Sequence, residues 1–65
     1  MPETARARSS LEQQALDYRN RAEQLRVVGE GTKRPGARRI LLELADDADR
    51  LAAGIEERLK AWGAP

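Results

Sequence analysis

The sequence predicts an all-α protein, an antiparallel two-helix hairpin of about residues 9–30 and 33–62. Apolar residues at alternating three- and four-residue spacing form two stripes, and such spacing keeps one face of a helix toward a partner helix. A turn rich in glycine over residues 31–36 separates the stripes, so the two helices lie side by side. The first stripe is Leu11, Ala15, Tyr18, Ala22 and Leu25, and the second is Ala37, Leu41, Leu44, Ala48, Leu51 and Ile55.

The first helix has two possible starts. Ser9 and Ser10 each precede a Glu or Gln by three residues, which is the capping-box pattern that begins a helix. Residues 1–8 are then disordered, or they extend the helix backward and meet the end of the second helix. The helix weakens near Gly29 and Gly31, either of which can adopt the left-handed conformation that ends a helix.

The second helix follows at once. Thr32 is the expected N-cap, and Pro35 is acceptable within the first turn. Gly54 lies inside the helix at a cost of about 1 kcal/mol relative to alanine, which predicts a close helix–helix contact there. The expected inner core, drawn from both helices, is Leu11, Tyr18, Leu25, Leu41, Leu44, Leu51 and Ile55.

Length and composition limit the stability that a single chain of this size can reach. The 65 residues make one domain, residues 9–65, and domains of about 60 residues bury only about 60% of the surface of the unfolded chain. Small scaffolds usually need a disulfide, a metal or a partner. The sequence has no cysteine and no histidine, which excludes disulfides and the usual zinc sites. We therefore expect a homo-oligomer, and an unidentified protein partner is the alternative.

Additional apolar residues indicate where a second chain binds. Ile40 flanks the second stripe, Leu42 points away from it, and Leu59 and Trp62 continue toward the C-terminal end. A helix needs a stripe of this width when it touches two neighbours, as in a four-helix bundle. The predicted interface is Ile40, Leu42, Leu59 and Trp62, and the predicted assembly is a dimer that forms a four-helix bundle.

Charge is nearly balanced, with 12 Lys and Arg against 11 Asp and Glu. Opposite charges four residues apart, such as Arg19/Glu23, Arg39/Glu43 and Glu56/Lys60, predict solvated helix faces. No apolar run has the length of a signal peptide or of a membrane span, so we expect a soluble cytoplasmic protein that does not bind membranes.

Catalysis and metal binding have little support. The acidic residues Glu43, Asp46, Asp47 and Asp49 have no histidine beside them, and a solvated helix face accounts for them. Ser9 and Ser10 have no base to activate them, and a two-helix hairpin lacks the volume of an enzyme pocket. We expect no enzymatic activity, no metal, no cofactor and no small-molecule substrate.

The turn carries the one distinct cluster of positive charge, which is Lys33, Arg34, Arg38 and Arg39. Backbone N–H groups at a helix start, together with basic side chains, suit an anion such as a phosphate. Nucleic acid is therefore an alternative ligand. Against it, no aromatic residue lies among the arginines to stack on a base, and Glu30 and the acidic stretch from Glu43 offset the charge.

Residues 18–52 resemble a group of short bacterial proteins, frequent in alphaproteobacteria, of no established activity. Their pattern is Tyr-Arg-x-Arg-Ala-Glu, a turn with proline, and Ala-Arg-Arg-x-Leu-Leu-x-Leu-Ala; here it occupies residues 18–23, Pro35 and residues 37–45. Arg34 and Gly36 replace the Asp and Glu that commonly flank the proline. The resemblance implies the helical hairpin and a bacterial origin.

Together these observations predict a small non-enzymatic protein-interaction or oligomerisation module. A nucleic-acid-binding bundle that uses the basic turn is one alternative. An accessory subunit that folds only on a larger complex is another.

Overall fold

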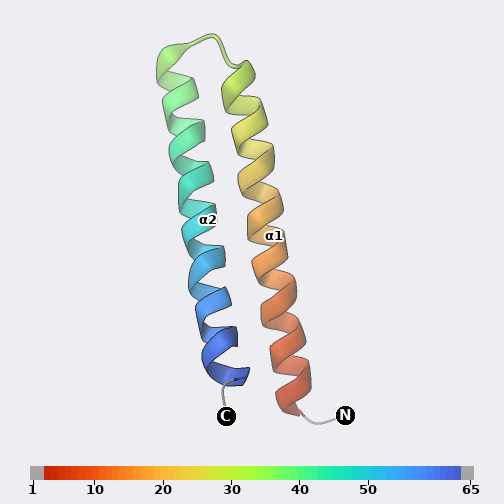
Figure 1. Cartoon of the computed structure of the whole chain (residues 1–65). Coiled ribbons are helices and arrows are strands. Elements are labelled where there is room, and N and C mark those ends of the chain that lie inside the picture. Colours follow the sequence, from red (N-terminus) through yellow and green to blue (C-terminus); the bar gives the residue numbers. More distant parts are fainter. Residues whose placement is uncertain (1–2, 64–65) are drawn as a thin grey trace.

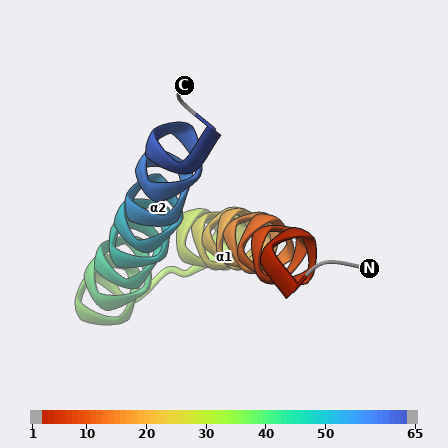
Figure 2. The same cartoon turned by 90° about the horizontal axis from the view of Figure 1, so that it is seen from below.

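The computed structural model describes residues 3–63 and places in them two helices, α1 (Glu3–Gly31) and α2 (Pro35–Gly63). The helices are antiparallel neighbours over their whole length, joined by a short turn (Figure 1). Viewed from below, they tilt in different directions and therefore cross (Figure 2). The molecule measures 49 × 20 × 11 Å, which makes it a flat slab with two broad faces. The predicted all-α hairpin is confirmed.

The start of α1 follows the extended alternative. The helix already includes Glu3, so Ser9 and Ser10 lie well inside it and the capping-box prediction is wrong. The segment from Ala5 to Arg8 alternates alanine and arginine, which are both good helix formers. An ion pair of 3.4 Å between Arg8 Nε and Glu12 Oε1 adds a contact across one turn. Residues 1–2 of the predicted N-terminal segment lie outside the described part of the chain.

Thr32 ends α1 rather than starting α2. Its backbone N–H donates to the Gly29 carbonyl at 3.1 Å, and its hydroxyl donates to the Val28 carbonyl at 2.7 Å. These bonds satisfy carbonyls that a helix end otherwise leaves free. No glycine between residues 3 and 63 has a positive φ, so the expected left-handed glycine cap is wrong too. α2 begins at Pro35, and Arg38 N–H donates to the Arg34 carbonyl at 2.9 Å.

The buried core consists of alanine. Ala15, Ala22, Ala45, Ala48 and Ala52 are at most 5% exposed, and among the described residues no larger side chain is buried. The predicted core positions Leu44 and Leu51 are wrong, because these side chains are 47% and 53% exposed. Two helices that meet through alanines approach more closely than leucines would allow, and the large residues move to the flanks. The half-buried flanking residues are Leu11, Tyr18, Leu25, Leu41 and Ile55.

The close contact lies at Gly29 and not at Gly54. A Cβ placed on Gly29 would lie 3.1 Å from Leu42 Cδ2 and 3.3 Å from Leu41 Cβ, whereas one on Gly54 would have no neighbour within 4 Å. Leu42 therefore packs between the helices against Gly29, and the expectation that it points away from the seam is wrong.

Candidate interaction surface

The buried alanines form a row between the two helices, which we call the alanine seam. It separates two broad faces, of which one is apolar and the other is charged. Successive residues of an α-helix are about 100° apart, so Tyr18 and Arg19 leave α1 on opposite sides of the buried Ala15 and Ala22. In α2, Leu51 and Asp49 likewise flank the buried seam. We call one side the apolar face, which is Tyr18, Leu25, Leu44, Leu51 and Ile55. We call the other the charged face, which is Arg19, Arg26, Asp49 and Glu56.

The apolar face is open to solvent. Tyr18, Leu25, Leu44 and Leu51 line a shallow hollow of about 350 Å³ that spans both helices. Ile55 extends the face in a second hollow that Tyr18 and Leu51 also line. Residues four and seven apart share one side of a helix, so Ile40 and Trp62 continue this face toward the two ends of α2. Ile40 and Trp62 are 58% and 40% exposed.

The exposed area is large for the size of the chain. The hairpin exposes 5162 Å², whereas compact monomeric proteins of its mass, 7.2 kDa, expose about 4,100 Å². The difference is comparable to the roughly 800 Å² that each partner buries in a standard interface. Monomers rarely expose contiguous apolar patches larger than a few hundred Å², and larger patches mark interaction sites. The apolar face therefore has the features of a surface that is covered by another chain.

The charged face ties the two helices together. Arg19 Nη2 lies 2.6 Å from Glu56 Oε1 and its Nη1 lies 3.0 Å from Asp49 Oδ1, while Arg26 Nη2 lies 2.6 Å from Asp49 Oδ2. Arg19 Nε also donates to Glu56 Oε2 at 3.3 Å, which makes the contact a two-bond fork. These ion pairs form one continuous chain along one side of the hairpin, in the order Glu56–Arg19–Asp49–Arg26.

These bonds shift the titration of the groups that make them. The hydrogen bonds from Arg26 and then Arg19 hold the pKa of Asp49 below its usual 3.8. The hydrogen bond from Arg19 lowers the pKa of Glu56 in the same direction. The arginine pKa values move upward for the same reason, so all four groups are charged near neutral pH.

Sequence reasoning missed the charged face. Arg19 and Glu56 pair with each other, and the expectation that they pair with Glu23 and Lys60 within their own helices is wrong. The expected Arg39–Glu43 pair is confirmed, at 3.1 Å. A signal was available, because Arg19 and Arg26 are one heptad apart in α1 and Asp49 and Glu56 are one heptad apart in α2. Opposite charges at matching heptad positions are typical of pairs between helices.

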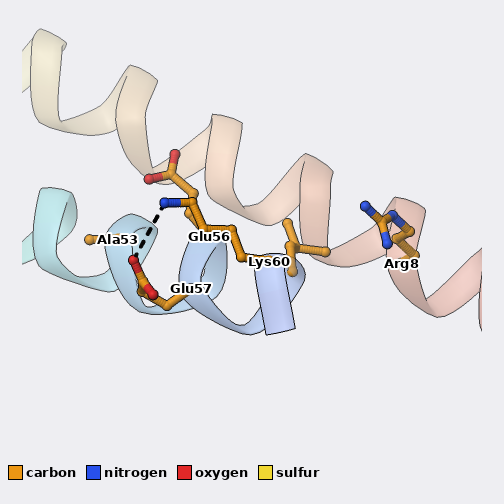
Figure 3. A pocket seen from close by; sticks show the side chains of 6 residues that line it. Arg8, Ala53, Glu56, Glu57 and Lys60 are labelled. Atoms are coloured by element: carbon orange, nitrogen blue, oxygen red, sulfur yellow. Dashed lines mark ion pairs between the residues drawn. The ribbon is translucent and has the colours of Figure 1, made fainter. Parts of the chain in front are cut away.

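The predicted interface residues do not come together as one site. Ile40 and Trp62 are exposed on the side of the apolar face, whereas Leu42 packs against Gly29. Leu59 is half-buried and lines an open hollow of about 450 Å³ with Arg8, Ala53 and Glu56. Figure 3 shows this hollow, where Lys60 Nζ is directed toward Glu57 Oε1 at 3.8 Å. Contact of these residues with another chain stays a prediction.

The four basic residues of the predicted anion site are exposed at the turn end of the hairpin, and they are Lys33, Arg34, Arg38 and Arg39. Arg38 and Arg39 line a hollow of about 340 Å³ together with Leu42, Glu43 and Asp46. Two carboxylates thus share the hollow with the two arginines and offset their charge. Binding of an anion or of nucleic acid at this turn stays a prediction.

Three acidic residues of α2 pair with different arginines. Glu43 pairs with Arg39, Asp47 with Arg50 at 3.8 Å, and Asp49 with the arginines of the charged face. Between residues 3 and 63 no three carboxylates are gathered in a way that could hold a metal ion. Over the same residues, neither helix combines the length and the apolar character that crossing a membrane requires.

Comparison of the chain with protein-family models, with curated proteins and with solved structures gives no match. The resemblance of residues 18–52 to short bacterial proteins therefore stays a prediction.

Proposed function

We propose that this chain is a small non-enzymatic protein-interaction module whose binding surface is the apolar face, and that it self-associates. The distribution of apolar residues is the observation that carries the proposal. Alanines fill the core, while Leu44 and Leu51 lie about half exposed on one broad face.

The energetic reason is the small amount of apolar surface that the hairpin buries alone. A fully buried Leu side chain contributes about 1.5–3 kcal/mol, and each additional buried CH₂ about 0.8 kcal/mol. A seam of alanines gains little of this burial free energy. The leucines contribute their share only when another surface covers them. Association through the apolar face therefore completes a core that the single chain leaves open.

The basic turn supports nucleic-acid binding less well. Glu43 and Asp46 line the same hollow as Arg38 and Arg39. Binding that depends on phosphate contacts would weaken steeply with salt, and replacement of Arg34, Arg38 and Arg39 would abolish it.

Sedimentation equilibrium over a range of concentrations tests the proposal. We expect the wild type to have a multiple of the chain mass of 7.2 kDa, and Leu44→Glu with Leu51→Glu to reduce it to a single chain. Leu16→Glu with Val27→Glu is the matched control, because these residues are 58% and 61% exposed on α1 away from the apolar face. The control should keep the wild-type mass.

A folded wild-type monomer at every concentration would contradict self-association. Weak helicity that does not change with concentration would favour the accessory subunit that folds on a larger complex. Equal loss of mass in the control pair would show that the apolar face is not the binding surface.

A further inference from the structure

The acidic and basic residues that border the apolar face are arranged so that they match the same residues of a second copy of the chain. On α1, Asp17 and Arg21 line one hollow together with Tyr18. On α2, Asp47 lines the hollow of Leu44, while Arg50 and Arg58 line the hollow of Ile55, and Arg50 Nη1 lies 3.8 Å from Asp47 Oδ1 within the helix. Each helix thus borders the face with one acid and at least one base, and on α2 the base farther from Asp47 is Arg58. Such an edge pairs with a copy of itself when a two-fold axis passes midway between the acid and the base.

The two edges place that axis at the same level. The midpoint between Asp17 and Arg21 is one residue from Tyr18, and the midpoint between Asp47 and Arg58 is between Ala52 and Ala53, within two residues of Leu51. Tyr18 and Leu51 line the same two hollows, so they are neighbours across the helices. Two pairs of charges on different helices therefore indicate one common axis.

We propose, building on the function proposed above, that a second copy of this chain covers the apolar face in a four-helix bundle with the two turns at opposite ends. In this bundle α2 stacks antiparallel on α2 of the second copy, and α1 on α1. Asp47 of each chain pairs with Arg58 of the other, and Asp17 pairs with Arg21 in the same way.

The size and the charge of the hairpin favour this arrangement. Tyr18 and Leu51 lie near the middle of α1 and α2, so an axis there overlaps the broad faces of 49 × 20 Å almost completely. The covered area then matches a standard interface of about 800 Å² per partner. The arrangement with both turns at one end would instead pair Arg21 with Asp47 and bring together two turns that each carry Lys33, Arg34, Arg38 and Arg39.

Oxidative cross-linking tests the position of the axis, and the chain has no cysteine of its own to interfere. A disulfide forms only when the two Cα atoms are within about 7 Å. We expect Leu51→Cys, beside the axis, to give a covalent dimer on a non-reducing gel. Leu44→Cys, one heptad away on the same face, is the matched control and should stay uncross-linked.

Charge reversal tests the pairing itself. Asp47→Arg and Arg58→Asp should each weaken association about ten-fold, since each replaces two exposed ion pairs by two repulsions. An equimolar mixture of the two variants should restore the wild-type affinity, because every pair then has opposite charges. The controls Arg6→Asp and Glu30→Arg reverse the same charges at exposed sites outside the apolar face and should change nothing.

The results separate this proposal from the function on which it depends. A wild-type monomer, or a dimer indifferent to Leu44→Glu with Leu51→Glu, overturns the proposed function. A dimer that needs both leucines but does not cross-link through Leu51→Cys overturns only the arrangement. Recovery in a mixture of Arg21→Asp with Asp47→Arg, and not in that of Asp47→Arg with Arg58→Asp, would place both turns at one end and overturn it too.

Discussion

Gly29 is the residue at which the two helices restrict each other most. A side chain there would meet Leu41 Cβ at 3.3 Å, an atom attached to the backbone of α2 that moves only if the helices separate. Gly54 has no such neighbour, although both glycines lie inside a helix. Alanine substitution at Gly29 and at Gly54 therefore separates the effect of helix propensity from the effect of helix packing.

We expect Gly54→Ala to stabilise the protein by about 1 kcal/mol, which is the propensity difference between the two residues. Gly29→Ala gains the same propensity but overpacks the seam, which typically costs about 1–3 kcal/mol. Its net effect should be at least about 1 kcal/mol less favourable than that of Gly54→Ala. Urea unfolding of both variants at one protein concentration measures this, and equal stabilisation would mean that the helices are not in close contact at Gly29.

Asp49 and Glu56 make the stability depend on acidity. Their pKa values are lower in the folded hairpin than in the unfolded chain, so their ion pairs stabilise the fold fully above the unfolded pKa values. This contribution begins to be lost below about pH 5, where the carboxyl groups of the unfolded chain start to be protonated, and it is gone once the pH has fallen through the folded pKa values. The arginine pKa values are raised and lie far above this range, so the carboxyl groups decide the effect.

We therefore expect the urea midpoint to fall between about pH 5 and pH 2, and Asp49→Asn to flatten that dependence while lowering stability at neutral pH. Glu43→Gln is the control, because Glu43 pairs with Arg39 of its own helix and belongs neither to the charged face nor to the apolar face. If both variants had the same pH dependence, the charged face would not be formed in solution.

At the scale of the element, the early start of α1 is decided by the partner helix. Helices gain most of their stability from packing and little from propensity alone. Residues 5–8 lie alongside the end of α2, where Arg8 shares a hollow with Leu59 and Lys60. An isolated first helix would lack that contact and could begin at the serines instead.

Ser9→Ala tests the extended helix. Inside a helix, alanine is better than serine by a few tenths of a kcal/mol, so we expect a small gain in stability. If the helix began at Ser9, the substitution would remove a cap and cost about 1 kcal/mol. The sign of the change in the urea midpoint distinguishes the two starts, and the helical circular-dichroism signal should stay constant.

At the scale of the whole molecule, the proposed dimer connects stability to concentration. Anything that binds only the folded state stabilises it, and in a self-associating protein the binding partner is the protein itself. We expect the thermal midpoint of the wild type to rise with protein concentration. The variant with Leu44→Glu and Leu51→Glu should unfold at a lower temperature that does not change with concentration, and calorimetry at several concentrations measures both.

The hairpin, its turn and its two long helices follow from patterns local in the sequence, and these predictions are confirmed. The failed predictions of the helix ends concern caps, whereas the failed predictions of the core depend on how α2 is rotated about its own axis. The larger side chains of Leu44 and Leu51 predict that their stripe faces inward, whereas α2 turns Ala45, Ala48 and Ala52 inward. The charged face was missed for the same reason, since that rotation brings Asp49 and Glu56 to Arg19 and Arg26.

Periodicity and composition alone predict a helical hairpin with more apolar surface than one chain can cover, because both are properties of each helix taken separately. Which stripe of α2 is buried and which is left open follows from the packing of the two helices against each other. Both stripes of α2 are compatible with a helix, and the choice between them depends on how closely the two backbones approach. Close approach at Gly29 and along the alanines satisfies the small residues and the ion pairs together, and it leaves the leucines on the open face.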